Sequence, residues 1–335
     1  MNVCILLGNG FTIDFSKFIK NPFMDVTNLF SKGDRVPWPG DNIPGFLSYK
    51  HCPNLWNLGV HSDIDSERGI AITEDIISCA NMQNENHKTQ TTTSKIYLRA
   101  YKELVQYLLA LFIYYNGLIS DEKLKGAKKW KWIKYIKKLY DKTDVEHIFI
   151  ITLNYDIWLE RLLKQLGIDF NIAGFENRND KKIQIFKPHG SISFQSKSQN
   201  DPIAYDINYS FDLLNDSPDQ FDIRYENLTC LGMLNAMVPP AGDSRRWHGL
   251  WASKVRKEIE NALQIMNEND EIIICGISYW HVDRAEIDGY LTKIPSSISN
   301  VMVINPAQPH SFNAVLTTYF DNVINFTSID NFIQK

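Results

Sequence analysis

The chain has 335 residues, 44% of them hydrophobic, and its 35 Lys and Arg residues nearly balance its 39 Asp and Glu residues, for a formal net charge of −4. A chain of this length can bury a large core, so we expect one α/β domain that carries a sizeable insertion. The charge balance argues against a protein that coats nucleic acid or an anionic membrane.

The five cysteines are dispersed, and none forms a CxxC pair. This pattern is typical of reduced thiols in a cytosolic protein and argues against a disulfide framework or a zinc knuckle. Residues 1–8 have neither a basic leader nor a small-residue cleavage site, so we expect no signal peptide. The longest apolar run, residues 107–115, falls well short of the roughly 20 residues that a membrane span needs. We therefore expect a cytoplasmic protein without a membrane segment or a metal cofactor.

Apolar runs alternate with helical patterns along much of the chain. Strands are expected at residues 2–7, 147–153, 182–187, 271–275, 301–304 and 322–326. Helices are expected at residues 95–118, 127–141, 158–166 and 247–266. Because most of these strands are apolar throughout, we predict a Rossmann-like parallel sheet with helices on both faces. The sheet domain is expected over residues 1–20 and 142–335, and a loop-rich, mainly helical insertion over residues 21–141.

Three segments have a composition of their own. Residues 81–94 are polar, which favours a mobile loop, and the polar residues 195–222 indicate a second insertion. The helix at residues 127–141 carries lysines around an apolar stripe. These lysines are Lys128, Lys129, Lys131, Lys134, Lys137 and Lys138. A solvated lysine face is the simpler interpretation, and a docking surface for an acidic partner or a nucleic acid strand is the alternative.

Ligands of open parallel sheets bind beyond the carboxyl ends of the strands, so the residues there are the first candidates for a site. The first strand ends in a glycine turn, residues 8–12. Its two glycines, Gly8 and Gly10, would let backbone N–H groups approach a pyrophosphate at the start of a helix. Ile13 stands where a full dinucleotide fingerprint has its third glycine, so a plain tight turn is an equal alternative.

Polar residues also follow the next two strands of this series. Asn154 and Asp156 come after the strand at 147–153, where they could cap a helix or hold a ribose, a water or a carboxamide. His189 follows the strand at 182–187 beside a glycine. A histidine there suits proton transfer with a sugar hydroxyl, and a structural histidine that caps a turn is the alternative.

The last two turns continue the pattern. Gly276 and Ser278 suit contact with a phosphate or a ribose, and Asp283 is expected to cap the helix that follows. Asn305 ends the strand at 301–304, where its amide could meet an adenosine ribose. Five polar turns at the ends of successive strands together favour a ligand site at one edge of the sheet.

The order of these motifs resembles the sirtuin superfamily, and more closely its bacterial sirtuin-like branch associated with phage defence. Residues 8–12 are similar to the glycine-alanine-glycine-x-serine loop, with Asn9 for alanine and Thr12 for serine. Residues 152–156 are similar to the threonine-glutamine-asparagine-x-aspartate motif, with Leu153 for glutamine.

The resemblance extends further along the chain. Residues 187–191 match the segment that holds the family's catalytic histidine. Residues 238–240, followed by 250–251 and 273–278, resemble a stretch of the bacterial branch in which a Pro-Pro loop leads through a helix to a glycine turn. In all, the similarity covers residues 1–15 and most of 147–310.

Two departures from the family bear on the reaction. Protein-deacetylating sirtuins carry a zinc module with two paired-cysteine motifs, and this chain has no such pair. No proline-aspartate-phenylalanine-arginine run follows the glycine loop. Both departures argue against peptide deacetylation and leave NAD+ as the substrate, with water as the acceptor.

The resemblance implies an NAD+ hydrolase that releases nicotinamide and ADP-ribose, and a role in anti-phage defence through NAD+ depletion. It implies that Asn154 positions the water or the ribose hydroxyls, that His189 accepts a proton, and that Asp156 holds the carboxamide or adds negative charge. The pyrophosphate is expected on Gly8, Asn9, Gly10, Phe11 and Thr12. The adenosine half is expected near Gly276, Ser278 and Asn305.

Such an enzyme must be restrained, so we expect control by homo-oligomerisation or by a separately encoded activator, of which a HerA-type ATPase is one family-based possibility. Two other functions stay open. Leu153 keeps a non-catalytic sensor of NAD or an ADP-ribose nucleotide in view, and an ADP-ribosyltransferase would use the same pocket. An inactive nucleotide fold is disfavoured because Asn154 and His189 are both present.

Overall fold

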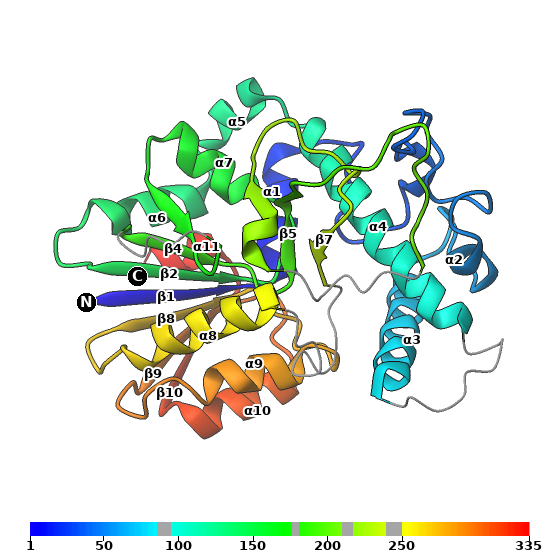
Figure 1. Cartoon of the computed structure of the whole chain (residues 1–335). Helices are drawn as coiled ribbons and strands as arrows, with labels where there is room; N and C mark the ends of the chain where they lie inside the picture. The colour runs from blue at the N-terminus through cyan, green and yellow to red at the C-terminus, as the bar shows by residue number, and fades with distance from the viewer. Residues whose placement is uncertain (86–94, 176–180, 210–216, 239–249, 335) are drawn as a thin grey trace.

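The computed structural model describes residues 1–85, 95–175, 181–209, 217–238 and 250–334. A seven-stranded parallel sheet crosses the molecule in the order β10-β9-β8-β1-β2-β4-β3 (Figure 1). Its strands are β1 (Asn2–Leu7), β2 (His147–Thr152), β3 (Phe170–Ile172), β4 (Ile183–Phe186), β8 (Glu271–Cys275), β9 (Asn300–Ile304) and β10 (Asn322–Phe326). The predicted Rossmann-like sheet is therefore confirmed, and all six expected strands lie within a residue of their expected bounds, whereas β3 was not expected.

Helices cover both faces of this sheet, as right-handed crossovers between parallel strands require. One face carries α1 (Asn9–Ile19), α6 (Lys131–Asp141), α7 (Trp158–Gln165) and α11 (Ile329–Ile333), and the other carries α8 (Leu250–Gln264), α9 (Arg284–Leu291) and α10 (His310–Tyr319) (Figure 1). Contacts of α6 with α7 and α11, and of α8 with α9, tie neighbouring helices together within each layer. The central strands β1, β2, β4 and β8 are thus buried on both sides, which explains their apolar sequences, whereas the edge strand β10 is partly exposed.

Most of the segment between α1 and α6 lies beyond the carboxyl ends of the strands, but its last helix lies against α7 and α1 (Figure 1). Its elements are η1 (Gly33–Arg35), α2 (Pro53–Asn57), α3 (Ser66–Glu85), α4 (Lys95–Gly117) and α5 (Asp121–Ala127). The buried α4 packs along α2 and α3. These helices therefore stand over the edge of the sheet where the candidate site was expected.

Several expectations need correction. Residues 81–85 belong to α3, so the loop expected at 81–94 is wrong there, and residues 86–94 lie outside the described part. The helix expected at 127–141 is interrupted at Trp130, whose extended backbone separates α5 from α6. Burial explains the break, because the Trp130 ring packs on Phe11 and its Nε1–H donates to Asp14 Oδ2 over 2.7 Å.

A second, antiparallel sheet was not expected. Its strands are β6 (Phe221–Ile223), β5 (Gly190–Ser196) and β7 (Asn235–Met237), in that order, and η2 (Pro218–Gln220) precedes β6. It takes up both ends of the segment 195–222 that was predicted as a polar insertion. Pro239 and Pro240, which form part of the family resemblance, lie outside the described residues.

The lysine-rich helix has the predicted two faces. Its lysines are exposed, whereas Trp132, Ile133, Ile136 and Leu139 are buried. Two of the lysines form exposed ion pairs, Lys131 with Asp330 and Lys137 with Asp141. Within the part of the chain that the structure describes, no helix is both long enough and apolar enough to span a bilayer.

The order of the strands reverses at β1, because the chain runs from β1 to β2 on one side and places β8 on the other. Leu7 pairs with Thr152 of β2 and with Cys275 of β8, so the three strands end level with one another. The turns that follow them therefore emerge together at a topological switch point, where open α/β sheets bind their ligands.

Two of these turns touch through their backbones. The Gly8 amide donates to the Cys275 carbonyl over 2.9 Å, and the Gly10 amide donates to the Gly276 carbonyl over 3.0 Å. A Cβ atom on Gly10 would lie 2.4 Å from the Gly276 Cα, and Gly276 itself has a φ of +64°. Glycine is thus required at both positions, for close approach and for the left-handed conformation.

Replacing Gly10 with alanine is expected to destabilise the chain by about 1–3 kcal/mol, because the added methyl group meets backbone that cannot move without shifting β8. Gly126→Ala is the matched control, since no atom lies within 4 Å of a Cβ there and alanine favours the helix α5. Urea unfolding of both variants checks the prediction. An unchanged midpoint for Gly10→Ala would show that the two turns do not depend on this contact.

Candidate functional site

A cavity of about 900 Å³ opens at the switch point. The predicted site residues that line it are Gly8, Asn9, Gly10, Thr12, Asn154, Asp156, His189, Gly276, Ser278 and Asn305. Phe11 is the one predicted site residue outside this lining, because its ring is buried against Trp130 and Trp132, with ring centroids 4.8 and 5.4 Å apart. The turns after five strands of the chain therefore meet at one cavity.

The opposite wall comes from the segment between α1 and α6. It includes Leu104, Leu108 and Phe112 of α4 and Gly69, Ile70 and Thr73 of α3. Sequence reasoning did not assign these residues to the site. Their amphipathic spacing indicates a buried helix face, and it does not say whether that face covers a core or a ligand.

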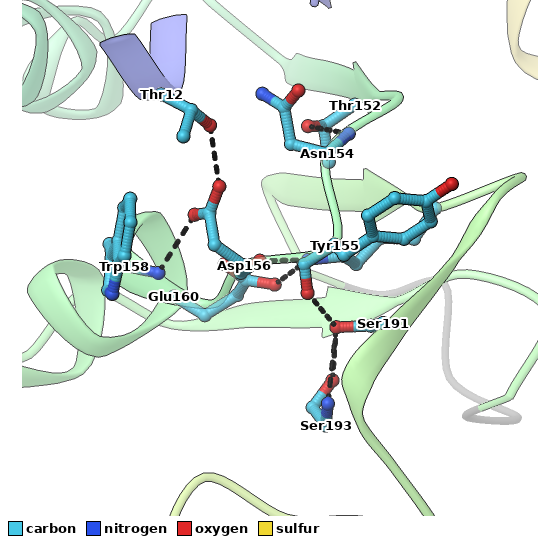
Figure 2. Close-up of polar contacts among 10 residues, drawn as sticks. Thr12, Thr152, Asn154, Tyr155, Asp156, Trp158, Glu160, Ser191 and Ser193 are labelled. Atoms are coloured by element: carbon cyan, nitrogen blue, oxygen red, sulfur yellow. Dashed lines mark hydrogen bonds and ion pairs between the residues drawn. The ribbon is translucent and has the colours of Figure 1, made fainter. Parts of the chain in front are cut away.

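The glycine turn after β1 is largely committed to internal contacts. The amides of Gly8 and Gly10 donate to the β8 turn, as described above, and the Asn9 side-chain amide donates to the Val26 carbonyl over 3.2 Å. The Thr12 hydroxyl donates to Asp156 Oδ2 over 2.5 Å (Figure 2). The turn therefore joins β1, β8 and the loop after β2 into one rigid edge of the cavity.

Asn154 spans the ends of β1 and β2. Its Nδ2 donates to the Gly8 carbonyl over 2.9 Å, which fixes the orientation of the side chain. Its backbone amide donates to the Thr152 hydroxyl over 3.2 Å, which holds the turn after β2 (Figure 2). Its Oδ1 accepts no hydrogen bond from the described residues, so this oxygen is the atom of Asn154 that a ligand can use.

Asp156 is engaged on both sides of its carboxylate. Oδ2 accepts from Thr12, and Oδ1 accepts from the Trp158 amide over 3.3 Å, at the start of α7 (Figure 2). The second bond occupies a free amide in the first turn of α7, although Asp156 is not the N-cap residue, which is Ile157. Burial raises the pKa of Asp156, and the nearby Lys187 ammonium offsets part of that effect.

Lys187 is a fully buried lysine that sequence reasoning noted only as part of a motif. Its Nζ donates to Glu160 Oε1 over 2.7 Å and to the Asp156 carbonyl over 2.5 Å. Burial raises the pKa of Glu160, although the Lys187 charge opposes this. The ion pair thereby fastens the end of β4 to the loop that carries Asn154 and Asp156.

His189 sits in the turn that joins β4 to β5. The Gly190 amide closes this turn on the Lys187 carbonyl, and Gly190 has a φ of +86°, which explains the glycine after the histidine. The imidazole is only 2% exposed and lies at the edge of the cavity. Its Nε2 is 2.7 Å from Glu286 Oε2, whereas its Nδ1 has no hydrogen-bond partner among the described residues.

Glu286, on α9, is the centre of a charged group behind this imidazole. Its Oε1 accepts from Tyr290 over 2.5 Å and from Arg256 over 3.2 Å. Burial alone would raise the pKa of Glu286, but the facing charges of His189 and Arg256 outweigh burial and lower that pKa to about 2. Glu286 is therefore a carboxylate at any physiological pH.

Asp283 adds a second carboxyl group at the same place. It occupies the N-cap position of α9, as predicted, but its side chain makes no capping hydrogen bond. Instead Asp283 lines the cavity, and its Oδ1 is buried without a partner in the described structure. Burial raises the pKa of Asp283 to about 6.

These carboxyl groups decide the charge of the histidine. Burial alone would lower the pKa of His189, but Glu286 and Asp283 outweigh burial, so the pKa of His189 is raised. Such a histidine is a stronger base than a free imidazole, and its neutral, proton-accepting form is populated above the raised pKa.

The turn after β8 completes the rim. Tyr279 has a φ of +52°, unusual for an aromatic residue, and is held there by stacking on Phe312 at 4.7 Å and by donating its hydroxyl to Asp288 over 2.8 Å. The Asn305 side-chain Nδ2 donates to the Ile277 carbonyl over 2.9 Å, and Ser278 is exposed. Asn305 thus braces the turn, and Ser278 presents a hydroxyl at the cavity.

Sequence reasoning missed Asp283 as a site residue, and Glu286 altogether. The available signal was their spacing of three, which places both carboxyl groups on one side of the first turn of a helix that follows a strand end. The described residues contain no group of three or more His, Cys, Asp or Glu arranged to hold a metal ion. No protein-family model matches this chain, and no curated protein matches its sequence.

Lys187→Met should destabilise the chain by about 3–5 kcal/mol, because it leaves the Glu160 carboxylate buried without its partner. The double variant Lys187→Met/Glu160→Gln removes both charges and should recover much of that loss. Urea unfolding of the two single variants and the double variant measures the coupling. If the double variant is as unstable as the sum of the single ones, the pair does not hold the loop through its charges.

Proposed function

We propose that this chain hydrolyses NAD+ at the nicotinamide–ribose bond and releases nicotinamide and ADP-ribose. The observation that carries the proposal is that Asn154 and His189, on the turns after β2 and β4, line one cavity at the switch point of a Rossmann-like sheet. Sheets of this topology bind dinucleotides at that point.

The dimensions and composition of the cavity support a ligand of this class. Its volume of about 900 Å³ is near the upper end of the range of roughly 300–1,000 Å³ for small-molecule sites. Apolar side chains of α4 form one wall, and a few polar groups converge from the strand ends. Such a combination suits a ligand with flat rings and polar sugars.

The charges of the site suit the reaction. When the C1′–N bond breaks, its electron pair neutralises the pyridinium ring of nicotinamide, and positive charge develops on the ribose. Carboxylates near the ribose would stabilise this positive charge. Asp283 lines the cavity, and Glu286 lies behind it. The oxygen of a water then bonds to C1′, and the proton it loses passes to His189.

Asn154 would contribute orientation. Because Nδ2 is fixed on the Gly8 carbonyl, Oδ1 is held in place and can accept a hydrogen bond from the water or from a ribose hydroxyl. Both oxygens of Asp156 already accept hydrogen bonds from the protein. We therefore expect Asp156 to contribute negative charge near the ribose without bonding the ligand directly.

The resemblance to bacterial sirtuin-like proteins extends the proposal to its setting. Depletion of NAD+ by such an enzyme would serve as an anti-phage defence. Because uncontrolled hydrolysis would harm the cell, the proposal includes control by homo-oligomerisation or by a separate activator, for which a HerA-type ATPase is a candidate.

His189→Ala and Asn154→Ala should each lower nicotinamide release from NAD+ by about 10²–10⁴, the usual contribution of a positioned general base or orienting group. His310→Ala and Asn269→Ala are matched controls, because both side chains are exposed and outside the cavity lining. Chromatography of nicotinamide and ADP-ribose gives the rate for each purified protein. The NAD+ content of cells that express each variant gives a second measurement.

Other outcomes of the same assay identify the alternatives. Tight NAD+ binding by calorimetry without nicotinamide release would support a nucleotide sensor, for which the existing bonds of Asn154 and His189 would be purely structural. Nicotinamide release with the label of [adenylate-³²P]NAD+ left on protein or nucleic acid would identify a transferase. Full turnover by both alanine variants would refute the assignment of these two residues.

A further inference from the structure

The hydrogen-bond partner of His189 determines which ring nitrogen is free to accept a proton. A neutral imidazole carries one N–H, and a carboxylate can only accept a hydrogen bond. Arg256 and the Tyr290 hydroxyl also favour the ionised form of Glu286, so beside a neutral imidazole the Nε2 that lies 2.7 Å from its Oε2 carries the proton. The lone pair of the neutral ring is then on Nδ1, the nitrogen that has no partner within the described residues.

Glu286 is itself held in place. Tyr290, one turn later on α9, donates to Oε1, and Arg256 of α8 donates to the same oxygen. The other oxygen, Oε2, is thereby left for His189. The Glu286 side chain is 3% exposed. Because both of its carboxylate oxygens are engaged, the carboxylate cannot rotate without breaking these bonds.

Glu286 and Asp283 raise the pKa of His189, whereas Arg256 lowers it. Tyr290 and Arg256 act on Glu286, and His281 acts on Asp283. Asp283 and Glu286 in turn raise the pKa of Tyr155. Glu286 is the one that contacts the imidazole directly. Asp283 adds a second carboxyl group without a hydrogen bond to the ring.

We propose that Glu286 is a positioning residue: its carboxylate holds Nε2–H of His189, presents Nδ1 as the proton acceptor, and stabilises the imidazolium that forms when Nδ1 takes the proton of the attacking water. This assignment rests on the proposed NAD+ hydrolysis for its catalytic meaning. Its structural core, the tautomer of His189 and the control of its charge by Glu286, can be measured without turnover.

The first test is nuclear magnetic resonance of the full chain with ¹⁵N-labelled histidine. The set of imidazole signals that is present in the wild type and absent in His189→Gln belongs to the ring of His189. Above its pKa, wild-type His189 should show Nε2 protonated and Nδ1 unprotonated. A ring protonated on Nδ1 would overturn the proposal, whether or not the protein cleaves NAD+.

The second test changes the charge and keeps the shape. Glu286→Gln retains an oxygen that can accept from Nε2–H but removes the negative charge, so the pKa of His189 should fall. Glu260→Gln is the control, because it neutralises a carboxylate of α8 whose ion pair with Lys293 is exposed and does not contact His189. It should leave the pKa of His189 unchanged.

The third test reads the pH profile of nicotinamide release. The proton-accepting form of His189 exists only above its pKa, so the wild-type rate should rise with pH through that raised pKa. In Glu286→Gln the rise should move to lower pH. The plateau rate should fall by about 10–100-fold, the loss typical for partners that orient a functional histidine.

Tyr290→Phe provides the opposite shift if Glu286→Gln does not fold. Loss of the hydroxyl leaves more negative charge on Glu286, so the pKa of His189 and the rise in the rate should move to higher pH. A purely structural role for Glu286 predicts lower stability with an unmoved pH profile. That outcome, in an active enzyme, would refute the positioning role and leave NAD+ hydrolysis intact.

Discussion

The close approach of Gly10 and Gly276 is the contact on which the candidate site depends. It joins the turns after β1 and β8 at the point where the strand order reverses, and no side chain could fit between them. The two turns form one edge of the cavity, Gly10 lies in the first turn of α1, and Asn154 is anchored on the Gly8 carbonyl. The glycines of this chain thus serve the contact between two strand ends, where a fold of this type would also approach a phosphate.

A balance of opposing electrostatic effects governs the second half of the site. Burial disfavours the charge on His189 and on Glu286 alike, but because the two groups face each other each keeps the other charged. Lys187 and Glu160 repeat the arrangement on the neighbouring loop. Two buried ion pairs therefore hold the turns that carry Asn154, Asp156 and His189, and each pair would be costly to break by removing one partner.

The sequence predicted the sheet and the ends of its strands well, because apolar β-branched runs and glycine stops are local signals. It did not predict α3, whose polar residues hide its helical period, or β5, whose buried Ser191 and Ser193 bond each other instead of presenting an apolar face. Glu286 lies far from His189 along the chain, and their contact depends on how α9 is rotated against the turn after β4. Such an orientation is a property of tertiary packing that no local pattern encodes.

The polar groups of the cavity come from the strand ends, and its apolar wall comes from α3 and α4. The proposed reaction requires that Asn154 and His189 meet the same sugar ring. A crystal structure with carba-NAD, an analogue that resists cleavage, tests this claim most directly. The account predicts the nicotinamide-side ring within hydrogen-bonding reach of Asn154 Oδ1, with Nδ1 of His189 directed at the same ring or at a water beside it. An analogue bound elsewhere, or one whose ring contacts neither residue, would contradict it.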